Sequence, residues 1–167
     1  MTENYENLNP QQLVPALVID GNTLTQSLSI MEYLEETRPE NPILPAKAYD
    51  RAQVRKIALS IAAEIQPIQN LKVLKYVGDE KKMEWGKHWI EKGFVALEKI
   101  LEKTAGEYCY GNSITIADFC LVPQVYNATR FSVDLNQFPI ISRINQTLSK
   151  LPQFEKAHPN NQIDAVL

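Results

Sequence analysis

The chain has 167 residues, 44% of them hydrophobic and 22% charged, which are ordinary values for a globular protein of one domain or slightly more. A net charge of −3, with no basic cluster interleaved with aromatic residues, argues against a nucleic-acid partner. No apolar run reaches the roughly 18 residues that span a bilayer, and the first residues lack a signal-peptide pattern, so we expect a soluble, cytoplasmic protein that does not enter membranes.

A short hairpin is the first predicted element. Asp20-Gly21 separates two β-prone runs, which places strands near 16–19 and 22–25. Apolar residues at helical spacing then predict a helix over 28–36. An isolated two-stranded hairpin is only marginally stable in water, so this is too little sheet for an independent domain.

Val14-Pro15 stands just before the first predicted strand. Proline cannot donate to a strand ladder, and an X-Pro bond is where a cis peptide costs least. With a cis bond, Val14 would offer its backbone N–H and C=O to an extended peptide, as in strand addition. The alternative interpretation is a turn with a purely structural role for Pro15.

Gln26-Ser27 stands where the predicted helix begins. Serine is a favoured N-cap, and the start of a helix presents unpaired N–H groups and the positive end of its dipole. A free carboxylate could therefore bind the Ser27 hydroxyl, the backbone N–H groups and the Gln26 amide. The alternative is that Ser27 only caps the helix.

A proline-rich segment is predicted to link two units. Prolines at 39, 42 and 45 exclude regular helix, so we expect units at 1–37 and 51–167 joined by a linker at 38–50. The first unit holds six acidic residues and no Lys or Arg, whereas the remainder holds 17 bases and 14 acids, and this asymmetry supports the division.

Long helical patterns fill the second unit. Two apolar stripes at helical spacing predict core-facing helices, one from Val54 to Ile68 and one from Trp85 to Leu101. Further helices are expected over about 115–131 and 139–151. These stripes are typical of a helix-bundle core rather than of a cofactor site.

Thr115 and Asp118 have the spacing of a capping box at the start of the third of these helices. Each side chain can accept a hydrogen bond from the other residue's backbone N–H, while Ile114 can pack on Phe119 across the first turn. Asp118 is therefore interpreted as a structural residue and not as a catalytic acid.

No metal site is expected from the cysteines and histidines. Cys109 and Cys120 have neither CxxC nor zinc-ligand spacing and are expected to be reduced and buried. His88 and His158 lack the companion residues of a metal or nucleophile site.

Several strings, taken together with Val14-Pro15 and Gln26-Ser27, resemble the zeta class of glutathione transferases, the maleylacetoacetate isomerase family. They are Asn9-Pro10, the seven residues Tyr33 to Pro39, the six residues Gln66 to Leu71, and the five residues Leu121 to Val125. The resemblance extends from about residue 4 to 158. It implies a mainly α fold, with a partial thioredoxin-like α/β domain (hairpin plus helix) followed by the all-α C-terminal helical domain.

The resemblance also assigns roles to individual residues. It implies that Val14 holds the cysteinyl backbone of glutathione and that Gln26 and Ser27 hold its γ-glutamyl carboxylate. In the helical unit it implies glutathione contacts from Gln66, Asn70 and Leu71, where Pro67 would bend the helix, and substrate carboxylate binding by Arg130.

One expected motif is absent from the printed sequence. Members of the zeta class carry a Ser-Ser-Cys type motif at their first helix, which lowers the pKa of the glutathione thiol. Roughly forty residues, the span of a βαβ unit, are missing before Asn4 relative to the family pattern. We therefore expect a chain truncated at its N-terminus, with no catalytic residue of its own and with thiol activation lost.

The resulting functional hypothesis is a glutathione-dependent cis–trans isomerase of tyrosine and phenylalanine catabolism, which converts maleylacetoacetate to fumarylacetoacetate. The resemblance implies glutathione as cofactor, small unsaturated or halogenated organic acids as substrates, and a homodimer. Two alternatives remain open. One is a noncatalytic module of the same fold for dimerisation or scaffolding, and the other is an alternative start or an incomplete gene product.

Overall fold

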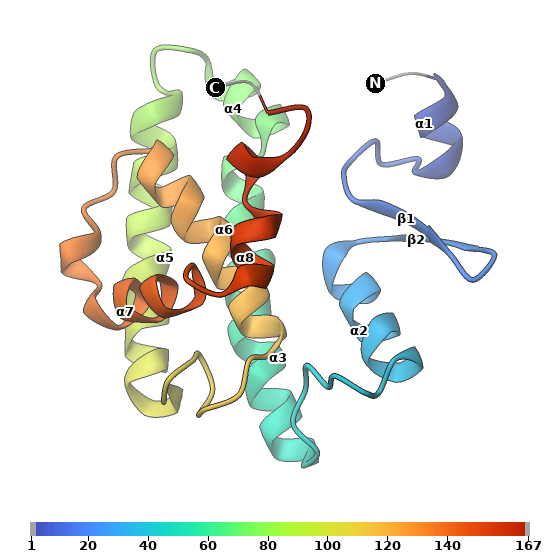
Figure 1. Ribbon diagram of the computed structural model, residues 1–167. Helices are drawn as coiled ribbons and strands as arrows, with labels where there is room; N and C mark the ends of the chain where they lie inside the picture. Colours follow the sequence, from blue (N-terminus) through green and yellow to red (C-terminus); the bar gives the residue numbers. More distant parts are fainter. Residues whose placement is uncertain (1–2, 166–167) are drawn as a thin grey trace. The chain divides into compact units, whose positions relative to one another are not determined.

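The computed structural model of the chain describes residues 3–165 (Figure 1), and the chain divides into two compact units, residues 1–44 and 45–167. The first unit contains helix α1 (Glu3–Leu8), strands β1 (Ala16–Ile19) and β2 (Asn22–Thr25), and helix α2 (Ser27–Thr37). The second contains helices α3 (Ala48–Ala62), α4 (Leu71–Val77), α5 (Lys82–Thr104), α6 (Ile116–Arg130), α7 (Pro139–Leu148) and α8 (Pro152–Ala157). Its 3₁₀ turns are η1 (Gln66–Gln69), η2 (Leu135–Gln137) and η3 (Pro159–Asn161).

The predicted hairpin is confirmed. β1 and β2 are antiparallel, and Ala16 lies opposite Thr25 at one end of the ladder while Ile19 lies opposite Asn22 at the other. Between them, Asp20 and Gly21 have φ angles of 51° and 75°. Positive φ at both central residues is what a two-residue hairpin turn of the primed type requires.

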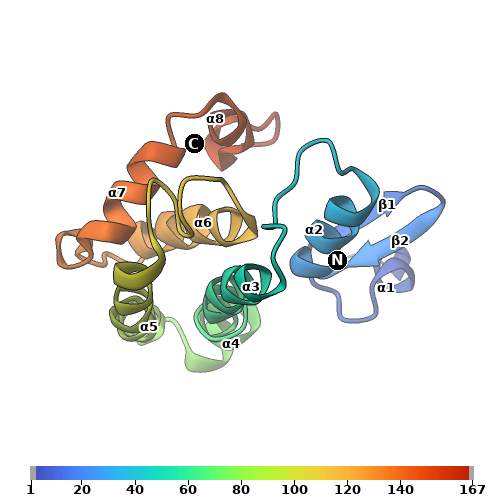
Figure 2. The same cartoon turned by 90° about the horizontal axis from the view of Figure 1, so that it is seen from below.

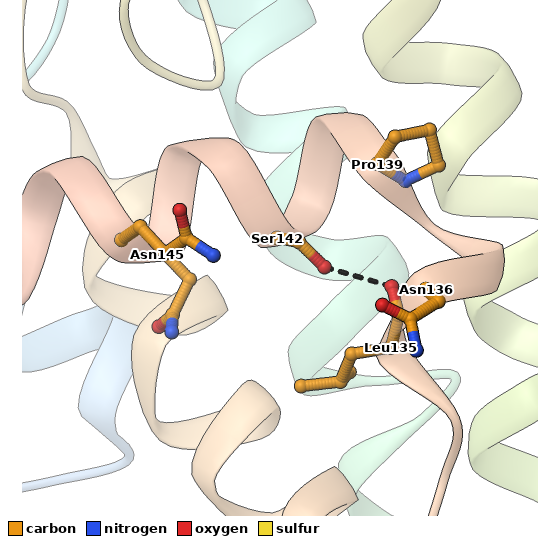
Figure 3. A pocket seen from close by; sticks show the side chains of 6 residues that line it. Leu135, Asn136, Pro139, Ser142 and Asn145 are labelled. Atoms are coloured by element: carbon orange, nitrogen blue, oxygen red, sulfur yellow. Dashed lines mark hydrogen bonds between the residues drawn. The ribbon is translucent and has the colours of Figure 1, made fainter.

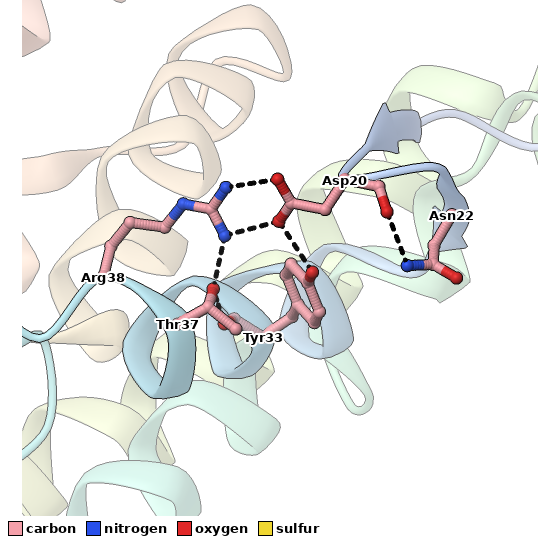
Figure 4. Close-up of polar contacts among 5 residues, drawn as sticks. All are labelled: Asp20, Asn22, Tyr33, Thr37 and Arg38. Carbon is pink, nitrogen blue, oxygen red and sulfur yellow. Dashed lines mark hydrogen bonds and ion pairs between the residues drawn. The ribbon is translucent and has the colours of Figure 1, made fainter.

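A polar cluster ties the hairpin turn to the end of α2 (Figure 4). Nη1 and Nη2 of Arg38 lie 2.7 and 2.9 Å from the two carboxylate oxygens of Asp20, and the Tyr33 hydroxyl donates to the same carboxylate at 2.7 Å. Arg38 also donates to the Thr37 hydroxyl at 2.6 Å. The paired guanidinium and carboxylate fix the orientation of the turn relative to the helix.

The second unit is a bundle of helices, as predicted. α3 packs against α5 and α6, and α7 packs against α5 and α6 (Figures 1 and 2). Residues on the predicted stripes are fully buried there, among them Val54, Ile57, Ile61, Ile90, Phe94, Leu97 and Leu101. No helix within residues 3–165 is both long enough and apolar enough to cross a bilayer.

Three boundaries differ from the prediction. The helix expected from Val54 to Ile68 is interrupted, because α3 ends at Ala62 and the separate 3₁₀ turn η1 follows it. The segment 38–50 is not all linker, because α3 begins at Ala48, three residues after the last proline of the segment, and Asp50 lies in its first turn. A negative charge in the first turn interacts favourably with the positive end of the helix dipole and stabilises the start of α3. The helix expected over 139–151 ends at Leu148, and a separate helix starts at Pro152, because proline suits the first turn of a new helix but not a helix interior.

Thr115 and Asp118 form the capping box at the start of α6. The buried Asp118 carboxylate accepts from the Thr115 backbone N–H at 2.8 Å, and its other oxygen accepts from the Cys109 N–H at 2.9 Å. The residue therefore fixes both the start of the helix and the loop before it. The Asp118 carboxylate also accepts from the Thr115 hydroxyl at 3.0 Å, so its hydrogen bonds all hold the start of α6 and the preceding loop, as expected of a structural residue.

A second buried carboxylate joins two helices that are far apart in sequence. Glu98 on α5 is only 9% exposed, and it accepts from the N–H groups of Ile140 at 2.6 Å and Ile141 at 3.1 Å. These are two of the N–H groups that the first turn of α7 leaves without an intrahelical acceptor. Glu98 thus caps α7 from another helix.

Candidate functional site

The turn before β1 presents an exposed backbone. The Val14–Pro15 peptide bond is cis, and the Val14 residue is 76% exposed. Its neighbour Leu13 is fixed in place, because its carbonyl accepts from the Tyr5 hydroxyl at 2.7 Å and from the side-chain amide of the buried Asn9. No described residue hydrogen-bonds the Val14 backbone, so its N–H and C=O can pair with an extended peptide.

The start of α2 differs from the prediction in one respect. Gln26 is the cap residue, with φ 68° and ψ 115°, and its carbonyl accepts the first helical hydrogen bond from Ile30 at 3.0 Å. Ser27 is therefore the first helical residue and not the N-cap. The left-handed φ of Gln26 turns the chain directly into the helix, so no side-chain cap is made there.

Because Gln26 and not Ser27 is the cap residue, the Ser27 hydroxyl is available for a ligand. It has no hydrogen-bond partner among the described residues, and the N–H groups of Ser27, Leu28 and Ser29 precede the first helical hydrogen bond. Ser27 is also exposed. A hydroxyl and unpaired amides at the positive end of a helix dipole are suited to a carboxylate.

The side chain of Gln26 is oriented by a partner that the sequence did not reveal. Its amide nitrogen donates to the side-chain oxygen of Gln11 at 2.7 Å. The Gln26 amide oxygen thereby remains able to accept a hydrogen bond from a ligand.

The predicted residues of the second unit lie around η1. Gln66 and Leu71 are exposed, Leu71 by 70%, and Asn70 connects η1 to α4 through its backbone, donating to the Pro67 carbonyl and accepting from Leu74. Pro67 lies in the first turn of η1, which follows the end of α3 at Ala62. The predicted bend is thus a break between two helices.

Arg130 is the last residue of α6 and its side chain is exposed. Nη1 of its guanidinium donates to the side-chain oxygen of Asn127 at 3.3 Å. The side-chain nitrogen of Asn127 in turn donates to the side-chain oxygen of the buried Gln69 at 2.7 Å. Hydrogen bonds therefore connect Arg130 to the turn that carries Gln66.

A hollow of about 250 Å³ on the surface of the second unit has a different character (Figure 3). It is lined by uncharged residues of η2 and α7: Leu135, Asn136, Pro139, Ser142, Asn145 and Gln146. The Ser142 hydroxyl in it donates to the Leu135 carbonyl at 2.8 Å. None of these lining residues is a cation that could pair with the carboxylates of glutathione, so we do not propose this hollow as the glutathione-binding site.

The cysteines do not have the properties of nucleophiles. Both are unpaired; Cys109 is buried and Cys120 is partly exposed. Burial, followed by the nearby Asp118 charge, raises the pKa of Cys109 well above its usual range and that of Cys120 to about 12. Thiols with raised pKa values are inert near neutral pH. Among the described residues there is also no group of three or more His, Cys, Asp or Glu side chains that could hold a metal ion.

Comparison with known proteins identifies the family. The family model for the glutathione S-transferase N-terminal domain matches residues 2–42, and that for the C-terminal domain matches residues 68–157. A probable maleylacetoacetate isomerase 2 of Drosophila melanogaster is 56% identical over 160 residues, which cover 96% of this chain and 70% of the relative. The maleylacetoacetate isomerase of Mus musculus is 56% identical over 163 residues, which cover 98% of this chain and 76% of that relative. The chain belongs to the maleylacetoacetate isomerase family, the zeta class of glutathione transferases.

Solved structures agree with this family. A maleylpyruvate isomerase described as a bacterial zeta-class glutathione transferase superposes with a TM-score of 0.94 at 39% identity, covering 99% of this chain and 82% of its own. A maleylacetoacetate isomerase from Anaeromyxobacter dehalogenans, solved with glutathione in its active site, superposes with a TM-score of 0.89 at 38% identity. The superposition covers 98% of this chain and 81% of the other. The fold expected from the zeta-class resemblance is confirmed.

Proposed function

We propose that this member of the maleylacetoacetate isomerase family is a glutathione-dependent cis–trans isomerase that converts maleylacetoacetate to fumarylacetoacetate. The observation that carries the proposal is the identity of 56% to relatives bearing that name over almost the whole chain. The relatives are enzymes by name, so we do not pursue the alternative of a noncatalytic module.

In this proposal the first unit holds glutathione. The free backbone of Val14 pairs with the cysteinyl residue, and the Ser27 hydroxyl with the adjacent amides binds the γ-glutamyl carboxylate. The oxygen of Gln26, whose amide is oriented by Gln11, accepts from the γ-glutamyl end. Support comes from the exposure of all three residues and from the chemistry of their unpaired groups.

The second unit supplies the remaining contacts. Gln66, Asn70 and Leu71 contact glutathione, and the Arg130 guanidinium binds a carboxylate of the substrate, for which its planar fork of donors is suited. When bound, glutathione supplies a sulfur nucleophile that transiently removes the double-bond character of the conjugated substrate, so that rotation can occur. We assign only binding roles to the residues named here, and none of them to thiol activation.

Two further parts of the proposal concern the class of substrate and the oligomeric state of the protein. A carboxylate-binding arginine favours small unsaturated or halogenated organic acids. We also propose a homodimer in the cytoplasm. Large exposed apolar side chains on the second unit, among them Tyr49 at 72% and Tyr76 at 94%, support association, which light scattering on the purified chain would test.

The isomerase function is tested by following maleylacetone with and without glutathione. We expect turnover only with glutathione, a KM for glutathione raised about tenfold by Ser27→Ala, and a KM for the acid raised about 10- to 100-fold by Arg130→Ala. Equal rates with and without glutathione would contradict the proposal.

A further inference from the structure

We infer that Asn127 is a positioning residue, which orients the Arg130 guanidinium for the substrate carboxylate and couples it to η1. The inference rests on the proposed function, because Arg130 and Gln66 have their roles from it. It is carried by a chain of three side-chain hydrogen bonds that ends on the backbone of Ile65.

The direction of each hydrogen bond in this chain follows from the chemistry of its members. A guanidinium can only donate, so the atom of Asn127 that faces Arg130 must be the amide oxygen. The Asn127 nitrogen then faces Gln69 and donates to its oxygen at 2.7 Å. The Gln69 nitrogen is left to donate to the Ile65 carbonyl, at 3.3 Å.

Reversing either amide would place donor against donor or acceptor against acceptor. Gln69 is only 4% exposed, so water cannot readily replace a lost partner there, and an unpaired buried amide is costly. The buried end of the chain therefore fixes the orientation of Asn127. Through its oxygen, Asn127 then fixes one edge of the otherwise exposed guanidinium.

The turn at the other end of the chain is held from a second side as well. The indole N–H of Trp85 on α5 donates to the Ile68 carbonyl in η1 at 2.9 Å. The turn that carries Gln66 is thus anchored to α5 by Trp85 and to α6 by Asn127. A shift of η1 would change the hydrogen bond that orients Arg130.

Preorganisation explains why an indirect contact matters for substrate binding. A free arginine side chain loses rotamer freedom when it captures a carboxylate, and a partner that already holds one N–H lowers that loss. The remaining N–H groups of Arg130 stay free to bind the carboxylate in a fork. Asn127 does not touch the substrate in this scheme.

Malonate, a small dicarboxylate, tests the inference by calorimetry with the full chain and without any need for turnover. Asn127→Ala is expected to weaken malonate binding about five- to tenfold, which is the loss of one hydrogen bond to a charged group. Arg130→Ala should weaken it further, and Asn127→Ala should then add nothing in the Arg130→Ala background, because Asn127 acts only through Arg130.

Two further variants guard against a folding defect. Gln69→Met removes the buried amide while keeping side-chain length, and it should weaken malonate binding by about threefold because Asn127 loses its anchor. Asn145→Ala, on α7, is the matched control and should bind malonate as the wild type does. Melting temperatures of all variants identify those that are folded.

The outcomes separate this inference from the proposed function. The role of Asn127 would be overturned by unchanged malonate binding in folded Asn127→Ala and Gln69→Met. It would also be overturned if Asn127→Ala caused the same loss of malonate affinity in the wild-type and Arg130→Ala backgrounds. Neither result would contradict the proposed function. A wild-type chain that binds no malonate would overturn the assignment of Arg130, and the inference with it.

Discussion

Asp20 shows how a single side chain can hold a turn in place. Its backbone is left-handed at the tip of the hairpin, and its carboxylate is paired with Arg38 and Tyr33 on α2 (Figure 4). The hydrogen bond from Arg38, followed by that from Tyr33, lowers the pKa of Asp20 below its usual value. The ionised carboxylate is therefore the form that the folded chain favours.

This pairing predicts a pH-dependent stability. The folded pKa of Asp20 is lowered. The stabilisation is therefore present above the usual pKa of an unfolded Asp, about 3.9, and is lost as the pH falls through the folded pKa. Asp20→Asn keeps a residue that tolerates left-handed φ but removes the charge. We expect its melting temperature to lie about 2 °C below the wild type at pH 7, a small effect because the pair is exposed.

Thermal melts at several pH values check this prediction. The difference between Asp20→Asn and the wild type should narrow as the pH falls below about 4, since the wild-type carboxylate then becomes neutral as well. A difference of the same size at pH 7 and at strongly acid pH would show that the charge is not its cause.

The sequence predicts the geometry of functional and structural residues best where the interacting residues are close together in the chain. The local signals at Val14-Pro15 and at the Thr115/Asp118 capping box correspond to local geometry in the structure. Ser27 is not the cap that the sequence predicts, because Gln26 adopts a left-handed conformation that its residue type does not indicate. Gln69 and Asn127 were missed because 58 positions separate them and no local pattern joins them.

At the scale of elements, long periodic helices were predictable and short ones were not. The stripes of α3 and α5 extend over several turns, so their periodicity identifies a buried face. α1 has six residues and η1 has four, which is too short for a periodic pattern. Short helices of this kind are defined by tertiary contacts, such as that of Trp85 with η1.

The cap of α7 by Glu98 gives a prediction at this scale. Glu98→Ala removes the acceptor for two N–H groups of α7 and should lower the free energy of unfolding by about 1–2 kcal/mol. Glu98→Gln, which keeps one acceptor oxygen, should lose less. Urea denaturation of the three proteins measures the difference, and an unchanged midpoint for Glu98→Ala would refute the capping role.

At the scale of the whole molecule, two units carry different parts of the proposed function. In the proposal, Val14, Gln26 and Ser27 of the first unit bind glutathione, and Arg130 of the second unit binds the substrate. The prolines and the uneven charge predict a linker over 38–50, and the division between Leu44 and Pro45 falls within that range, although α3 already starts inside it at Ala48. The start of α3 follows the last proline of the segment, Pro45, and is not delayed to the residues where the helical pattern becomes clear.

The central claim is that the start of α2 holds glutathione, and a calorimetric titration of the purified chain tests it most directly. Ser27→Ala removes the free hydroxyl, whereas Ser29→Ala removes the hydroxyl of another exposed serine of the same helix, keeps the backbone N–H that the proposal uses, and serves as the matched control. We expect the wild type and Ser29→Ala to bind glutathione alike, and Ser27→Ala to bind it about tenfold more weakly. No binding heat from the wild type up to about 10 mM glutathione, or equal affinities for all three proteins, would contradict the claim.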